Sequence, residues 1–203
     1  MKKIGILAYG SLIDEPGPEI GPVIDYHLED ETPFRVEFAR ESRTRGGAPT
    51  LVPVEEGGST IKAIILVLKE YVSEEEAKDM LYRREINKTC SQKKYDPPDP
   101  CVPKGDRVCI EEDNENFPDL ELVLYTKIAP TPNLTPEKLA SLAIKSARSK
   151  FGAQRRDGIS YLIDIKSRGN KTPLMDKYEE KILDSTKTSN LEEAWEACRR
   201  DHC

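Results

Sequence analysis

The sequence predicts a globular α+β protein built around a compact mixed sheet or barrel. Short strand-like runs recur along the chain, and segments with helical spacing and capping signals are interspersed among them. One long polar stretch interrupts this series, and no segment repeats another. The length of 203 residues suits one domain with a sizeable insertion, so we expect a single domain over residues 1–203.

Five segments have the patterning of strands, namely residues 3–9, 33–39, 50–54, 61–68 and 120–128. The first is a short apolar run that ends at a Tyr-Gly-Ser turn. The second alternates, which places Phe34, Val36 and Phe38 on one face. The fourth is continuously apolar and rich in β-branched residues, which is typical of a buried strand.

Helix signals follow at four places: a start at Ser73, a segment from Thr135 to about Phe151, one from Pro173 to Leu183, and one that Asn190 caps and that runs through Glu192 to Cys198. Ser73 and Glu76 have the spacing of a capping box. Thr135 and Pro136 combine a cap with a proline at the first helical position. The pattern of residues 155–168 fits a strand or a helix. We expect a helical C-terminal extension from about residue 170.

Residues 88–118 differ from the rest of the chain, with five prolines, three cysteines and many charges. This composition predicts an insertion or a long loop. The three cysteines, Cys90, Cys101 and Cys109, either form a metal or redox site or are plain loop thiols. Their wide spacing favours plain thiols, and we expect no metal and no cofactor.

Composition excludes several function classes. The net charge is -6 and the lysines and arginines are dispersed, which argues against nucleic acid as a partner. No apolar run is long enough for a membrane span, so we expect no membrane partner. The apolar start is short and is followed by Asp14, Glu15 and Pro16, so we interpret it as a strand rather than a signal peptide.

The chain has five cysteines, which is an odd number, and none is closely paired with another in the sequence. This pattern fits free thiols in a reducing compartment, so we expect a cytoplasmic location. The end of the chain, from Cys198 to Cys203, is a poor zinc candidate, and we expect a frayed tail there.

The turn Tyr9-Gly10-Ser11-Leu12 is the first candidate for chemistry. Glycine permits a sharp turn and the close approach of a ligand. Successive backbone N–H groups in such a turn form a concave site suited to a carboxylate. The alternative is an ordinary strand-ending turn. Ser11 is a weak candidate nucleophile, because neither histidine of the chain has a convincing context for a Ser-His pair.

Glu85 and Arg40 are the other candidates. Glu85 comes one helical turn after Leu81, at the rim of an apolar stripe, so its carboxylate should be partly buried and its pKa raised toward that of a useful base. The alternative is an exposed glutamate that pairs with an arginine or a lysine. Arg40 ends a strand near two further arginines and offers positive charge to a bound carboxylate, unless this segment is a solvated hairpin.

The order of these segments resembles the γ-glutamylcyclotransferase family, and most closely its glutathione-degrading branch. The matching segments are Tyr9 to Leu12 with Pro16-Gly17, Phe38-Ala-Arg40-Glu-Ser42, Arg45-Gly-Gly-Ala-Pro49, Leu81-Tyr-Arg-Arg-Glu85, Leu122-Val-Leu-Tyr125 and Tyr161-Leu162. The resemblance covers roughly residues 3 to 165. Residues 154–158 depart from the branch pattern, and the insertion after Glu85 is the main departure, which leaves the substrate open.

The resemblance implies a mixed β-barrel or sheet flanked by helices. It also implies an intramolecular acyl transfer, in which the α-amine of a γ-glutamyl unit attacks its own γ-carbonyl and 5-oxoproline forms. Glu85 falls on the catalytic glutamate of the family, as general base and then acid. Tyr9, Gly10, Ser11 and Leu12 would hold the substrate.

Arg40 and Tyr125 would support the pocket. The expected substrate is glutathione, a γ-glutamyl amino acid or another γ-glutamyl amine. The alternative function is a non-catalytic binding protein of the same fold, for a small acidic metabolite or a protein partner.

Overall fold

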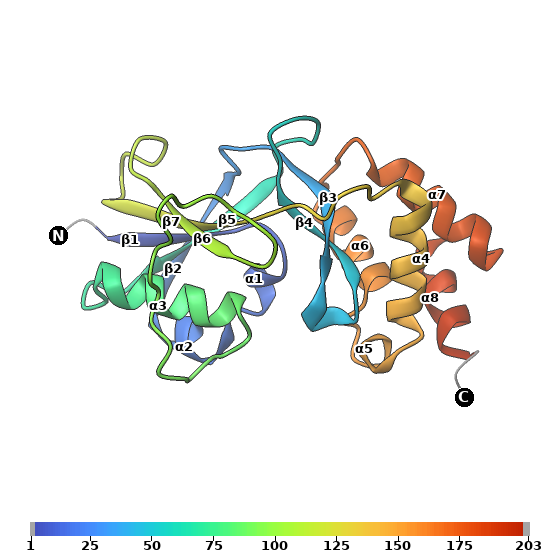
Figure 1. The fold of residues 1–203 in the computed structure, drawn as a ribbon, viewed down its shortest axis with the longest axis horizontal. Helices are drawn as coiled ribbons and strands as arrows, with labels where there is room; N and C mark the ends of the chain where they lie inside the picture. The colour runs from blue at the N-terminus through green and yellow to red at the C-terminus, as the bar shows by residue number, and fades with distance from the viewer. Residues whose placement is uncertain (1–2, 201–203) are drawn as a thin grey trace. The chain divides into compact units, whose positions relative to one another are not determined.

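The computed structural model of the chain describes residues 3–200 (Figure 1). Its contacts divide the chain into two compact units, which are described separately. The first comprises the chain up to residue 33 and residues 61–129, and the second comprises residues 34–60 and those from 130 onward. The single domain expected from the sequence stays a prediction. The frayed tail expected at the C-terminus falls largely on residues 201–203, which lie outside the described residues.

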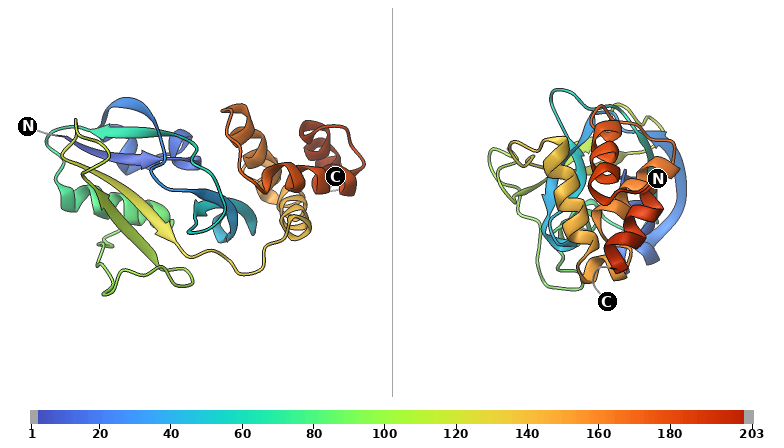
Figure 2. Two further views of the ribbon diagram at one scale, coloured as in Figure 1. Left: turned by 90° about the horizontal axis from the view of Figure 1, so that it is seen from above. Right: turned by 90° about the vertical axis from the view of Figure 1, so that its right-hand side faces the viewer.

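The first unit is built on a five-stranded sheet in the order β2-β5-β1-β7-β6 (Figures 1 and 2). The strands are β1 Ile4–Ala8, β2 Ile24–Glu31, β5 Lys62–Leu68, β6 Val108–Asp113 and β7 Leu122–Ile128. β1 runs parallel to β7 and antiparallel to β5, so the sheet is mixed, as expected. β2 and β6 form its two edges. The described strands therefore make an open sheet, so of the two expected alternatives the mixed sheet is observed and the closed barrel is not.

Gly5 makes the centre of this sheet possible. It lies in register with Val67 on one side and Val123 on the other. A Cβ atom at Gly5 would meet Ile65 Cγ2 at 2.4 Å and Leu120 Cδ1 at 3.1 Å. Because glycine has no side chain, Gly5 leaves room for the apolar groups of the neighbouring segments.

Helix α3, Glu74–Glu85, packs against one face of the sheet (Figure 1). Its apolar residues Ala77, Met80 and Leu81 share a buried cluster with sheet residues. The predicted capping box is confirmed, because the Ser73 hydroxyl accepts from the Glu76 N–H at 3.3 Å and the Ser73 N–H donates to the Glu76 carboxylate at 3.0 Å. The unit also holds three short turns of helix, α1 Ser11–Asp14, α2 Gly17–Ile20 and η1 Gly21–Val23.

The second unit combines a hairpin with five helices. Its elements are β3 Val36–Ser42, η2 Arg43–Arg45, β4 Ala48–Pro53, α4 Pro136–Ala147, α5 Lys150–Ala153, α6 Gly158–Ser167, α7 Met175–Thr186 and α8 Leu191–Arg200. Phe38 on β3 meets the rings of Tyr161 and Tyr178 edge-on, at centroid distances of 6.0 and 5.3 Å. The right-hand view in Figure 2 faces the helices of this unit.

The structure resolves the ambiguity of residues 155–168, because Gly158–Ser167 form the helix α6. Asp157, which is fully buried, caps this helix by accepting hydrogen bonds from the N–H groups of Ile159 and Ser160 at 2.9 and 3.1 Å. The helix expected from Pro173 begins at Met175, and the one expected to reach Phe151 ends at Ala147, with α5 after it.

Two strands were missed. β6, Val108–Asp113, lies within residues 88–118, so the interpretation of this segment as a loop was wrong over that strand, while its interpretation as an insertion stays a prediction. Residues Val108, Cys109 and Ile110 are buried in β6, which pairs with β7. β2 was not predicted because it is an edge strand with mostly exposed, polar side chains, so it has no apolar alternation.

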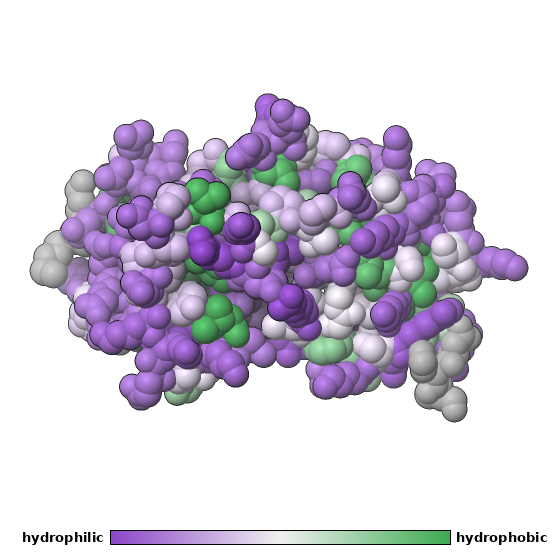
Figure 3. Space-filling view, viewed as in Figure 1, coloured by the Kyte–Doolittle hydropathy of each residue, from purple (hydrophilic) through white to green (hydrophobic). Residues whose placement is uncertain are grey.

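Within the described residues, no helix has both the length and the apolar character needed to cross a membrane. Cys90, Cys101 and Cys109 are free thiols, as expected. The face shown in Figure 3 is largely hydrophilic. Over the described part of the chain, the large apolar side chains that are exposed are Tyr26, Tyr71 and Val102.

Candidate functional site

The guanidinium of Arg84 connects the Tyr9–Leu12 turn to Glu85. Arg84 Nη2 donates to Ser11 Oγ at 3.0 Å, and Arg84 Nη1 donates to Glu85 Oε1 at 2.7 Å. Arg84 also donates to the backbone carbonyl of Glu15 at 3.2 Å. Two predicted parts of the site, which are 74 residues apart in sequence, are therefore joined by one side chain within the first unit.

Glu85 occupies the last turn of α3. Its side chain is 15% exposed, so the partial burial expected from its place after Leu81 is confirmed. The pairing with an arginine, which the alternative interpretation required, is present as well. A carboxylate at the C-terminal end of a helix is opposed by the helix dipole, and the adjacent Arg84 offsets this cost.

The end of α3 is held by a Schellman motif, which positions Arg84 and Glu85. Asn87 has a φ of 54°, in the left-handed region that asparagine tolerates. The N–H of Lys88 donates to the carbonyl of Arg83 at 2.8 Å, and that of Asn87 to the carbonyl of Arg84 at 3.2 Å. The helix thus stops directly after Glu85, and the insertion begins there.

The turn itself leaves β1 and starts α1. Ser11 and Leu12 are the first two residues of α1, so their N–H groups have no acceptor within that helix. The Leu12 side chain is 8% exposed and belongs to the core cluster, so only its backbone is suited to a ligand. The Ser11 hydroxyl accepts from an arginine, which fits a positioning role better than a nucleophilic one.

Tyr125 lies on β7, and Tyr9 is hydrogen-bonded to the same strand. The Tyr9 hydroxyl donates to the carbonyl of Thr126 at 3.2 Å. Tyr125 lies opposite Glu111 of β6 in the sheet register. Burial, with further effects from the nearby carboxylates of Glu111 and Asp113, raises the pKa of Tyr125 to about 12. Its phenol therefore stays protonated at neutral pH and keeps a proton to donate.

Arg40 belongs to the second unit, whereas the other predicted site residues belong to the first. It lies on β3, in register with Thr50 of β4, beside an irregularity between Phe38 and Arg40. The strand end expected for this segment is confirmed in part, because β3 continues through Ser42. The contribution of Arg40 to a pocket with Glu85 stays a prediction.

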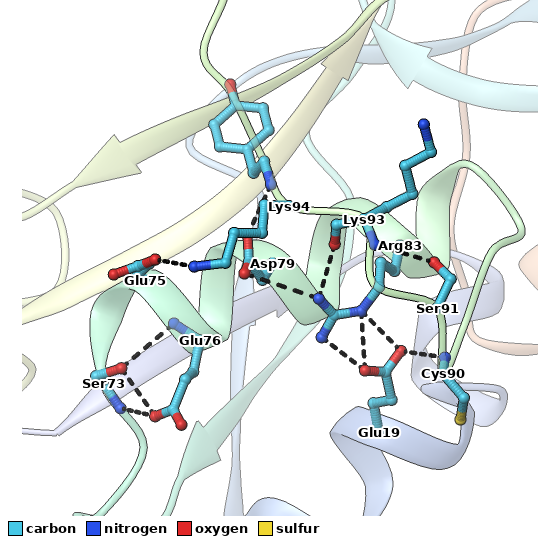
Figure 4. A network of polar contacts seen from close by, with 11 residues as sticks. Glu19, Ser73, Glu75, Glu76, Asp79, Arg83, Cys90, Ser91, Lys93 and Lys94 are labelled. Atoms are coloured by element: carbon cyan, nitrogen blue, oxygen red, sulfur yellow. Dashed lines mark hydrogen bonds and ion pairs between the residues drawn. The ribbon is translucent and has the colours of Figure 1, made fainter.

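A second polar network adjoins Arg84 on α3 and holds the start of the insertion (Figure 4). Arg83 makes a bidentate contact with Glu19 of α2, in which Nη2 donates to Oε1 at 2.6 Å and Nε donates to Oε2 at 3.1 Å. The Cys90 N–H donates to Glu19 Oε2 at 2.7 Å, and Arg83 Nη1 donates to the Lys93 carbonyl at 2.9 Å.

The same helix holds the insertion further along. The Asp79 carboxylate accepts from the Tyr95 N–H at 2.6 Å, and Lys94 pairs with Glu75 at 2.7 Å. Tyr95 in turn reaches β6, because its hydroxyl accepts from the Ile110 N–H at 2.9 Å. Residues 90–95 are therefore tied to α2, α3 and β6, so this part of the insertion is ordered by specific contacts.

We expect the Glu19–Arg83 contact to make stability depend on pH. The hydrogen bonds from Arg83, with the Cys90 N–H, lower the pKa of Glu19 from its ordinary value of 4.5. Because the folded-state pKa is lowered, this contribution is fully present above about pH 4.5 and is lost as the pH falls through the lower folded value. Urea unfolding at pH 7 and below pH 4 should show a smaller acid-induced loss in Glu19→Gln than in the wild type. An equal loss in both would contradict the assignment.

Several of these residues were not identified as site residues from the sequence. Arg84 appeared only as part of a motif, and neither Glu19 nor Arg83 was singled out. Glu19 lies in a short helix that has no periodic signal, and Arg83 is one of two adjacent arginines on a charged helix. Their pairing depends on how α2 meets α3, which no local pattern encodes.

No family model, curated protein or solved structure matches the chain. Within the described residues, no group of three or more His, Cys, Asp or Glu side chains is arranged to hold a metal ion.

Proposed function

We propose that the protein is a γ-glutamylcyclotransferase that releases 5-oxoproline from a γ-glutamyl substrate, with Glu85 as general base and acid. The observation that carries the proposal is the Ser11–Arg84–Glu85 connection, which places the candidate carboxylate beside the candidate substrate-binding turn. This is the arrangement that the reaction requires, because one proton carrier must act close to the bound glutamyl group.

The reaction uses a nucleophile that the substrate already contains. Glu85 accepts a proton from the α-ammonium group, and the freed amine attacks the γ-carbonyl carbon. The new C–N bond closes a five-membered lactam and the original γ-amide bond breaks. Glu85 returns the first proton to the leaving amine, and the second proton, which the ring nitrogen loses after attack, passes to the same amine, which leaves as an ammonium ion. The backbone N–H groups of the Tyr9–Leu12 turn hold the α-carboxylate or the oxyanion.

Arg84 has a supporting role in this proposal. Its guanidinium joins Ser11 to Glu85, so it sets the orientation of the carboxylate relative to the turn. Tyr125 contributes a donor to the pocket, and glutathione or another γ-glutamyl amine is the substrate, in the cytoplasm.

The second candidate is a binding protein for a small acidic metabolite. The close Arg84–Glu85 pair favours it, because a carboxylate that stays engaged by a guanidinium is a poor proton carrier. In that case Arg84 would leave Glu85 and bind the ligand carboxylate.

The two candidates differ in turnover. The protein is incubated with glutathione, γ-glutamyl amino acids and γ-glutamyl amines, and 5-oxoproline is measured by chromatography. The enzyme proposal predicts release from at least one donor. A rise in the melting temperature with the same ligands, without any 5-oxoproline, would favour the binding protein and overturn the enzyme.

A further inference from the structure

The two edges of the five-stranded sheet differ in how they are covered. At β6 the N–H of Ile110 donates to the Tyr95 hydroxyl at 2.9 Å, so a residue of the insertion caps that edge. At β2, within residues 3–200, no hydrogen bond is made to the outward backbone groups of His27 or Glu29. β2 therefore keeps an open edge, which is a template for a further strand.

The register with β5 determines which backbone groups of β2 point outward. The Thr32 N–H donates to the Ile61 carbonyl at 2.9 Å, so hydrogen-bonded pairs with β5 recur at every second residue before Thr32. His27 and Glu29 occupy the alternate positions of this antiparallel register, so their N–H and C=O groups point away from the sheet. A short, regular ladder is therefore available at this edge.

Negative charge accompanies the open edge. Glu29, Asp30 and Glu31 are exposed, and none of them forms an ion pair within the part of the chain that the structure describes. Lys62 of β5 lies opposite Glu31 in the register, so three carboxylates face one ammonium group here. A second copy of the chain would bring like charges together at this edge, whereas a basic segment would be attracted to it.

The two faces of β2 define the partner further. Successive side chains alternate between the faces, so one face carries Glu29 and Glu31, and the other carries Tyr26, Leu28 and Asp30. Tyr26 is 42% exposed. A strand added at this edge would place every second side chain beside Glu29 and Glu31 and most of the intervening ones beside Tyr26 and Leu28. Lysine or arginine fits the first set of positions, and valine or another apolar residue fits the second.

We propose that the open edge of β2 binds an extended basic segment of a partner protein, which adds to the five-stranded sheet as a further strand. The backbone of the partner bonds to the outward groups of His27 and Glu29, and its alternating cationic side chains pair with Glu29 and Glu31. The backbone bonds supply affinity, and the charges select the partner. This inference does not depend on the proposed catalytic activity.

The first test uses the full-length protein and a fluorescent peptide of alternating lysine and valine, with binding followed by fluorescence anisotropy at low salt. Two further peptides carry N-methyl groups on the amides of either the lysines or the valines, so the charge is kept and every second donor is lost. Strand addition uses only one of these two sets of donors, so one methylated peptide should bind like the parent and the other about tenfold more weakly. Equal affinities of the two methylated peptides, or no binding of the parent, would overturn the proposal.

Variants of the protein separate the backbone bonds from the charges. His27→Pro removes an outward N–H that β5 does not use, a position at which an edge strand tolerates proline. Its affinity for the parent peptide should be about tenfold lower than that of His27→Ala, with both variants folded by circular dichroism. If His27→Pro does not fold, the methylated peptides decide the same question.

The charges are tested in a double variant, Glu29→Gln with Glu31→Gln. Its affinity at low salt should fall by about tenfold, and its dependence on salt should be weaker than in the wild type. Unchanged affinity would contradict the assigned preference for a basic partner. A dimer of the protein that the peptide dissociates would assign the edge to a second copy of the chain and overturn the proposal.

Discussion

Glu85→Gln is expected to lower the rate of 5-oxoproline release by about 10²- to 10⁴-fold, the range typical of a lost general acid–base group. Glutamine has the shape of glutamate, and its amide oxygen can still accept from Arg84 Nη1, which lies 2.7 Å from Glu85 Oε1. The contact between Arg84 and Ser11 is also left in place. The loss would therefore report on proton transfer rather than on a collapsed site.

Glu75→Gln is the matched control for this variant. Glu75 lies on the same helix, its side chain is 74% exposed, and its partner Lys94 is exposed too. We expect its rate to equal that of the wild type, and the thermal unfolding midpoints of both variants to remain close to the wild-type value. A folded Glu85→Gln protein with an undiminished rate would remove Glu85 from the mechanism.

Arg83→Met is expected to lower the free energy of unfolding by about 3 kcal/mol, because it leaves a partly buried carboxylate without its counterion. The side chains of Arg83 and Glu19 are only 13% and 17% exposed. Methionine preserves most of the apolar stem of Arg83. It removes every hydrogen bond that the Arg83 guanidinium donates to Glu19 and to the Lys93 carbonyl. Urea unfolding followed by circular dichroism measures the change.

Two companion variants make this result specific. Lys94→Met breaks an exposed pair on the same helix and should cost no more than about 0.5 kcal/mol. Adding Glu19→Gln to Arg83→Met should recover part of the loss, because the uncompensated charge is then removed. If Arg83→Met is no more destabilising than Lys94→Met, the Glu19–Arg83 contact does not hold the insertion.

The elements that could be predicted are those with local signals. The capping box at Ser73 and Glu76, the cap at Thr135 with Pro136, and the apolar run that became β5 each depend on residues close together in the chain. β6 could not be found in this way, because prolines before it mark a loop and its three buried residues are too short a pattern to stand out.

In the candidate site too, local signals could be predicted and contacts between distant segments could not. Glu85 was found from its position after Leu81, and its partial burial followed from that spacing. The partner of Glu85 was not found, because Arg84 points to Ser11 only once β1, α1 and the end of α3 are brought together. The choice between a sheet and a barrel was left open for a related reason, since strand patterning says which faces are buried but not whether the sheet edges meet.

The sequence by itself determined the α+β class, the capped helices, the central buried strands and the turn from Tyr9 to Leu12. These follow from backbone preferences and hydrophobic periodicity, which act over a few residues. Only the tertiary structure decided that the sheet stays open and that Arg84 joins the turn to Glu85. Such contacts depend on which segments pack together, and that is settled by the whole chain rather than by any window of it.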